Sequence, residues 1–140
     1  MKFDADCARE ILLKIEEISD FKECKSECHD YAYKRISPKK LAEMFEDYEP
    51  REVMYNLLKL QEAGFLLSDF NKMRSIYPSG FKYDTLTIYD LTFEGAQYLE
   101  TVRDPEIWKQ IKNTLQDKAI SLSFKAITAA FQYIINKRLS

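Results

Sequence analysis

The stretch from Ser37 to Phe65 encodes two short helices in close succession, and it limits the folds open to this chain more than any other feature. Ser37-Pro38 predicts the start of the first helix, because a serine hydroxyl accepts from an otherwise unpaired backbone N–H and proline fits the first helical position. A polar break, Asp47-Tyr48-Glu49, leads to Pro50 and the second helix. Gly64 predicts its end, since glycine adopts the left-handed conformation of a helix terminus. The pattern indicates a helix-turn-helix.

The segments around this pair complete the order of a winged helix-turn-helix. Apolar residues at spacings of three and four predict a helix from Asp4 to Ser19. We expect a loop from Asp20 to Asp30, where charged residues and cysteines show no period, and then a short strand from Tyr31 to Ile36. Two β-type runs, Phe65 to Phe70 and Asp84 to Leu91, predict a hairpin with a long tip and a turn at Pro78-Ser79-Gly80.

The rest of the chain is predicted to be helical. Thr92 is a cap for one helix, Asp104-Pro105 starts another, and a final helix runs from about Ser121 to Leu139. We therefore expect an α+β, mainly helical fold. Residues 1–103 would form the winged helix-turn-helix domain, and residues 104–140 a C-terminal extension of two additional helices packed on the same domain.

Composition excludes several classes of function. The 140 residues are 46% hydrophobic with a net charge of −2, which is typical of a single domain and excludes a wholly basic nucleic-acid coat. No apolar run is long enough to span a membrane or to serve as a signal peptide, so we expect a cytoplasmic protein without a membrane partner. The three glycines are isolated, so no glycine-rich phosphate loop is present. We expect no enzymatic activity and no cofactor.

The second helix of the pair predicts a nucleic-acid interface. Its buried stripe, Val53, Leu57 and Leu60, leaves the opposite face for contacts. Guanidinium and amide groups present donor patterns that the major groove of double-stranded DNA distinguishes, so Arg51, Tyr55 and Asn56 are the expected base contacts. The expected contacts to the DNA backbone are the basic residues Lys39, Lys40, Lys59, Lys72, Arg74 and Lys82. On this hypothesis the chain is a non-enzymatic DNA-binding protein that acts in transcription regulation or as an accessory factor.

The acidic residues near this helix favour an alternative. Glu43, Glu46, Asp47, Glu49 and Glu52 place negative charge where it would repel a duplex. The alternative is a protein-interaction module that binds a host protein through this acidic connection or the final helix, without contacting DNA.

Two further groups of residues are candidates for binding. Cys24, Cys28 and His29, with Cys7 far away in sequence, have poor spacing for zinc, and we expect no metal and reduced thiols. The final helix has a broad apolar arc that predicts a homodimer interface made by Phe124, Ile127, Phe131, Ile134 and Ile135. Packing of this helix on the first helix would explain the same pattern.

Three stretches of the chain resemble a known family. They are the opening Met-Lys-Phe-Asp-Ala-Asp-Cys-Ala-Arg-Glu, the middle Glu52-Val-Met-Tyr-Asn-Leu-Leu-Lys-Leu-Gln-Glu-Ala-Gly64, and Leu91-Thr92 with Glu94-Gly95, Arg103-Asp104 and Trp108. The sequence is similar over nearly its whole length to domain-of-unknown-function family 2513 of bacterial and phage proteins. The resemblance implies a winged-helix core and often a phage or prophage setting, and it supplies no activity, ligand or catalytic residue.

Overall fold

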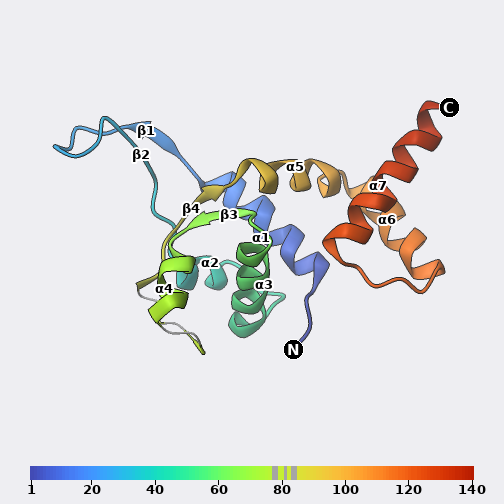
Figure 1. Ribbon diagram of the computed structural model, residues 1–140, viewed down its shortest axis with the longest axis horizontal. Coiled ribbons are helices and arrows are strands. Elements are labelled where there is room, and N and C mark those ends of the chain that lie inside the picture. Colours follow the sequence, from blue (N-terminus) through green and yellow to red (C-terminus); the bar gives the residue numbers. More distant parts are fainter. Residues whose placement is uncertain (77–78, 81, 83–84) are drawn as a thin grey trace.

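A computed structural model describes residues 1–76, 79–80, 82 and 85–140, with the side chains of residues 73–75 also outside the description. It shows an α+β chain that is mainly helical, with two small antiparallel sheets (Figure 1). None of the helices in the described ranges is long and apolar enough to cross a membrane.

The first three helices form where the sequence predicts them. Helix α1 (Ala5–Ile18) begins at Asp4, whose carboxylate accepts from the Cys7 N–H at 3.0 Å. Helix α2 (Pro38–Glu43) is capped by the Ser37 hydroxyl, and α3 (Pro50–Glu62) begins at Glu49. Each of these caps satisfies a backbone donor that the helix itself leaves unpaired.

The end of α3 is also as predicted. Gly64 has a φ of +80°, and the Phe65 N–H donates to the Leu60 carbonyl at 3.0 Å. This is the hydrogen bond expected when a left-handed residue ends a helix and the chain reverses.

A hairpin replaces the loop predicted between Asp20 and Asp30. Strands β1 (Phe21–Glu23) and β2 (Tyr31–Tyr33) pair antiparallel, with Phe21 opposite Tyr33. The prediction of a loop was wrong for β1, because it relied on local periodicity. The strand is instead specified by pairing with β2, which places Phe21 opposite Tyr33 and Glu23 opposite Tyr31.

The predicted hairpin of Phe65 to Phe70 with Asp84 to Leu91 is confirmed in its pairing. Strands β3 (Leu66–Ser68) and β4 (Ile88–Leu91) are antiparallel, with an irregularity between Leu67 and Ser68. Their connection contains helix α4 (Phe70–Ile76), which the sequence did not predict. The turn expected at Pro78-Ser79-Gly80 lies partly outside the described residues.

Ile36 adds a third chain segment to this sheet. Its N–H donates to the Ile88 carbonyl at 2.8 Å, and the Ile88 N–H donates back to the Ile36 carbonyl at 2.9 Å. The segment that leads into α2 is therefore bonded to β4, on the edge away from β3. These two hydrogen bonds fix the start of α2 relative to the sheet.

Three capped helices complete the chain. They are α5 (Phe93–Val102), α6 (Pro105–Asp117) and α7 (Phe124–Leu139). The caps are Thr92, Asp104 and Ser123, and α7 begins later than predicted because Ser123, whose hydroxyl accepts from the Ala126 N–H at 3.1 Å, is its cap. Helices α6 and α7 pack against each other and against α5.

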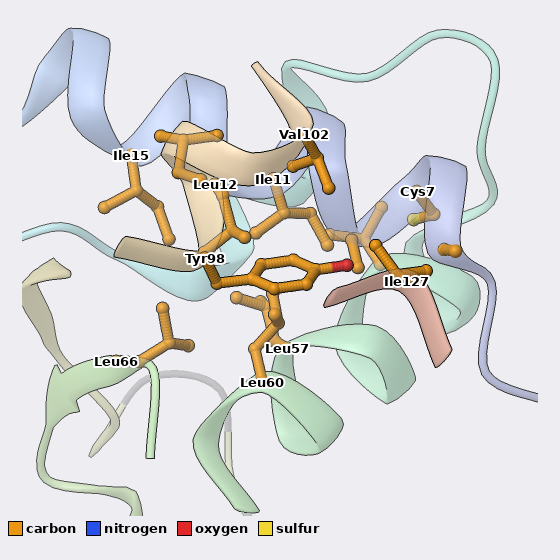
Figure 2. Close-up of a cluster of buried hydrophobic side chains, with 14 of the residues drawn as sticks. Cys7, Ile11, Leu12, Ile15, Leu57, Leu60, Leu66, Tyr98, Val102 and Ile127 are labelled. Carbon is orange, nitrogen blue, oxygen red and sulfur yellow. The ribbon is translucent and has the colours of Figure 1, made fainter. Parts of the chain in front are cut away.

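The core is built around α1. Ile11, Leu12 and Ile15 are fully buried among residues from α3, α5 and α7. Figure 2 shows the Tyr98 ring of α5 in the middle of this cluster, with its hydroxyl pointing between aliphatic side chains. That hydroxyl is buried without a hydrogen-bond partner, and burial raises the pKa of Tyr98.

Polar contacts hold α1 against the C-terminal helices. Arg9 donates to the Val102 carbonyl at 2.7 Å and to the Arg103 carbonyl at 2.8 Å. It thus supplies hydrogen-bond donors to backbone carbonyl groups at the end of α5. The Trp108 indole N–H donates to the Asp6 carboxylate at 2.8 Å. The backbone at the end of α5 and a side chain of α6 are thereby tied to the first turns of α1.

Candidate nucleic-acid interface

The solvent-facing side of α3 carries three of the four predicted contact residues on that helix. Arg51, Tyr55 and Lys59 lie four residues apart and so share one face. Arg51 is exposed, whereas Tyr55 and Lys59 are half-buried. The Lys59 ammonium lies 5.1 Å from the centroid of the Tyr55 ring and 3.0 Å from the Glu62 carboxylate. The Lys59 charge is therefore already partly compensated within the helix.

The fourth residue, Asn56, is not available to a ligand, and the prediction that it contacts bases was wrong. Only 1% of Asn56 is exposed. Its Oδ1 accepts from the Asp4 N–H at 2.9 Å, and its Nδ2 donates to the Glu52 carbonyl at 2.9 Å. Both polar ends of the amide are thus hydrogen-bonded, as buried polar groups require: Oδ1 joins α3 to the chain just before α1, and Nδ2 bonds within α3.

The predicted backbone contacts lie on three elements. Lys39 and Lys40 are exposed on the first turn of α2. Lys72 on α4 is exposed, as is Lys82. The side chain of Arg74 lies outside the described residues.

Two more exposed basic residues precede α2. Lys34 and Arg35 follow β2 directly, so they extend the positive charge of Lys39 and Lys40 toward the first hairpin. Residues 31–42 contain these four basic side chains and no Asp or Glu. The densest positive charge near the helix pair is therefore at the start of α2 and not on α3.

Negative charge is concentrated in the connection between α2 and α3. Glu43, Glu46, Asp47 and Glu49 are all exposed there. The Glu52 carboxylate accepts from the Glu49 N–H at 3.4 Å and closes the first turn of α3. A duplex laid along α3 would meet Arg51 and Lys59 on the helix and this acidic connection beside its N-terminus.

The cysteines are distributed over two distant parts of the fold. Cys7 is buried in α1, where burial is the main cause that raises the pKa of its thiol to about 12. Cys24 and Cys28 are in the tip of the β1–β2 hairpin with His29. The backbone N–H of His29 donates to the Ser26 hydroxyl at 3.1 Å. Within the described ranges, no three or more His, Cys, Asp and Glu side chains form a group able to hold a metal ion.

The proposed dimer face of α7 is mostly internal. Ile127 and Ile134 are buried in the chain's own core, so their assignment to an interface was wrong. Phe124 packs on Phe3, Phe65 and Tyr98, with ring centroids 4.7, 4.9 and 5.0 Å away. The apolar arc of α7 is broad because α5 and α6 both pack against it.

Phe131 and Ile135 remain half-buried on α7. The helix also exposes Tyr133 and Leu139. These four side chains are what α7 can offer to a second copy of the chain. Of the five residues predicted for that interface, Phe124, Ile127 and Ile134 are used within one copy.

Aromatic residues of the β1–β2 hairpin were missed as binding candidates. Phe21, Tyr31 and Tyr33 are 59%, 60% and 40% exposed, although large aromatic rings usually contribute to a core. The signal in the sequence was the alternation of Tyr31 and Tyr33 with smaller or charged residues. It predicted a strand, but nothing in it indicated that the rings would face solvent.

Comparison with known proteins agrees with the family resemblance. The chain is 26% identical, over the full length of both sequences, to a protein of Haemophilus influenzae that carries the name "Uncharacterized protein". No solved structure matches the present chain. The model of the family described as "Hypothetical protein (DUF2513)" matches residues 2–121. Because that match spans most of the sequence, the chain belongs to the DUF2513 family.

Proposed function

We propose that this chain is a winged helix-turn-helix protein that binds double-stranded DNA without catalysing a reaction. The observation that carries the proposal is the bonding of Ile36 to β4. It gives a three-segment antiparallel arrangement in the order Ile36, β4, β3. Helix α1 precedes Ile36 in the chain, and α2 and α3 lie between Ile36 and β3. This order of helices and strands is the one in which a winged helix presents its third helix to a groove.

The placement of the C-terminal helices supports the same proposal. Helix α3 packs against α1, α2 and β3, whereas α6 and α7 pack on α5 (Figure 1). The face with Arg51, Tyr55 and Lys59 therefore stays accessible. In this proposal Arg51 and Tyr55 contact bases, and Lys59, Lys39 and Lys40 contact phosphates.

Binding to a random-sequence duplex at several salt concentrations tests this function. Each phosphate contact by a Lys or Arg contributes about 0.9 to the slope of log affinity against log salt. The double variant Lys39→Ala with Lys40→Ala should lower that slope by about 2. Arg51→Ala should weaken binding at every salt concentration.

Exposed Lys109 on α6 and Lys125 on α7 supply the matched control, because they lie on helices that do not belong to the helix-turn-helix. Their double replacement by alanine removes the same charge and should leave the slope unchanged. A slope that falls equally in both double variants would contradict a local site, as would a wild-type protein that does not bind the duplex at low salt.

The acidic connection between α2 and α3 favours a second candidate function. Four exposed carboxylates there would attract a basic protein surface and repel phosphates. If the chain acts as a protein-interaction module, replacing Glu46 and Asp47 with Gln and Asn should weaken the retention of a host protein from nuclease-treated lysate. The same changes should strengthen duplex binding if DNA is the ligand, so the two functions predict opposite results.

A further inference from the structure

Four aromatic rings form a continuous row that begins on the β1–β2 hairpin and reaches β4. The centroid of Phe21 lies 6.1 Å from that of Tyr31 and 4.8 Å from that of Tyr33, and the Tyr33 centroid lies 6.3 Å from that of Tyr89. We call Phe21, Tyr31, Tyr33 and Tyr89 the aromatic strip. Its members come from three strands, and none of them belongs to the buried core.

The pairing of the strands explains why the rings share one face. Phe21 is opposite Tyr33, and residues directly opposite in an antiparallel pair point to the same side. Tyr31 is two residues before Tyr33 and so also points to that side. The hairpin projects from the rest of the molecule (Figure 1), which leaves the rings exposed to solvent.

Positive charge lies next to the strip. Lys34 and Arg35 are exposed immediately after Tyr33, and Lys39 and Lys40 follow at the start of α2. The acidic residue on the ring face of the hairpin, Glu23, is opposite Tyr31 at the far end of the strip. At the body end of the strip this basic segment begins near Asp20, whose carboxylate is 3.8 Å from the Lys22 ammonium and so is itself paired with a Lys.

We propose that the aromatic strip binds single-stranded nucleic acid, with bases stacked on its rings and phosphates contacted by Lys34 and Arg35. Exposed flat rings beside a basic segment are the two components of such sites, because every base has a π-face and every nucleotide a charged phosphate. Aromatic side chains are also common at protein interfaces, so the observation that favours a nucleic acid is the basic segment: residues 34–40 contain four Lys or Arg and no Asp or Glu. This site is separate from the α3 face that the proposed function assigns to a duplex.

The test compares two labelled twelve-nucleotide strands by fluorescence anisotropy at low salt. One is oligothymidylate, and the other is an abasic strand of the same length and charge. Stacking predicts that the protein binds the thymidylate strand at least about tenfold more tightly. Lys34→Ala with Arg35→Ala should weaken binding to both strands and reduce the salt dependence.

Substitutions at Tyr31 separate stacking from simple apolar contact. Tyr31→Phe keeps the ring and should bind thymidylate within about twofold of the wild type, whereas Tyr31→Leu keeps apolar area and should lose about tenfold. Tyr133→Leu on α7 is the matched control, because Tyr133 is 54% exposed and should not affect binding. Arg51→Ala should weaken duplex binding only, which distinguishes failure of the strip from failure of the α3 interface.

Equal affinity for the thymidylate and abasic strands would overturn the proposal, since charge alone would then account for binding. So would wild-type affinity in Tyr31→Leu. If sedimentation shows a dimer that Tyr31→Leu converts to a monomer, with no change in strand binding, then the strip joins two copies of the chain and the nucleic-acid assignment is wrong.

Discussion

Gly95, in the first turn of α5, lies against backbone with no room for a side chain. A Cβ at this position would be 2.2 Å from the Phe65 carbonyl oxygen and 2.9 Å from its carbon. The neighbouring Thr92 N–H donates to the same carbonyl at 3.0 Å, and its hydroxyl donates to the Gly64 carbonyl. The first turn of α5 therefore packs directly on the backbone of Gly64 and Phe65, where the chain reverses after α3.

Gly95→Ala should destabilise the protein even though alanine is the better helix former. The added methyl meets backbone, which cannot rotate away as a side chain could, so we expect the free energy of unfolding to fall by about 1–3 kcal/mol. Chemical denaturation monitored by circular dichroism measures the change. Gly80→Ala is the control, because nothing lies within 4 Å of a Cβ there and its φ is not in the left-handed region. Equal stability of the two variants would argue against the close approach.

At this same scale, Asn56 shows where prediction from sequence stops. The stripe of Val53, Leu57 and Leu60 follows from helical periodicity, and that periodicity placed Asn56 on the outward face. The burial of Asn56 depends on Asp4, whose N–H it binds from 52 positions away in the chain. Helical periodicity within α3 contains no information about that contact.

Among the elements, α1 and α5 are joined by an ion pair across the surface. The Arg103 guanidinium donates to both Glu16 carboxylate oxygens at 2.6 Å, and also contacts Glu100 at 2.7 Å. The hydrogen bonds from Arg103 hold the pKa of Glu16 below its usual value of 4.5. The charged carboxylate is therefore the form that the folded protein favours.

The sign of the pH dependence follows from that lowered pKa. Glu16 contributes stability at pH values above its unfolded pKa, and the contribution is lost as the pH falls through the folded pKa. Because both partners are partly exposed, we expect Glu16→Gln to cost at most about 1 kcal/mol near neutral pH. The difference from the wild type should shrink below about pH 4.5.

Urea denaturation at pH 7 and at pH 3 measures both points. Glu17→Gln is the matched control, since Glu17 pairs with Lys14 on the same helix, 3.1 Å away. A deficit in Glu16→Gln that is the same at both pH values would show that the carboxylate charge is not what stabilises the contact.

Elements with their own start and stop signals were the ones predicted from sequence. The serine, threonine and Asp-Pro caps and the glycine after α3 are local, so α2, α3, α5 and α6 could be placed without tertiary information. Strand β1 and helix α4 carry no such signals. Strand β1 is fixed by its pairing with β2, and α4 lies inside a connection that periodicity alone presented as a hairpin tip.

For the whole molecule, the packing of α7 decides whether the C-terminal helices unfold with the rest. Phe124 stands among Phe3 from the N-terminal segment, Phe65 after α3 and Tyr98 on α5. Trp108 on α6 is buried and hydrogen-bonded to α1. Contacts of this kind indicate one cooperative unit that includes residues 104–140.

Phe124→Ala should therefore lower the stability of the entire chain. We expect a loss of about 2–3 kcal/mol, because the half-buried ring leaves a gap between three elements. The transition followed by Trp108 fluorescence should coincide with that followed by far-UV circular dichroism. Phe93→Ala, at a site 75% exposed, is the control and should change stability by less than about 0.5 kcal/mol. Two separate midpoints in Phe124→Ala would mean that the C-terminal helices fold independently.

The base of the β1–β2 hairpin is closed by a hydrogen bond from the Lys34 N–H to the Asp20 carbonyl at 2.8 Å. Chain entry and exit are therefore adjacent, and residues 21–33 form an excursion that the helical body does not need for its own closure. Such an appendage can be shortened, lengthened or exchanged at little cost to folding. The sequence of residues 21–33 can thus change while the scaffold that carries the hairpin stays the same.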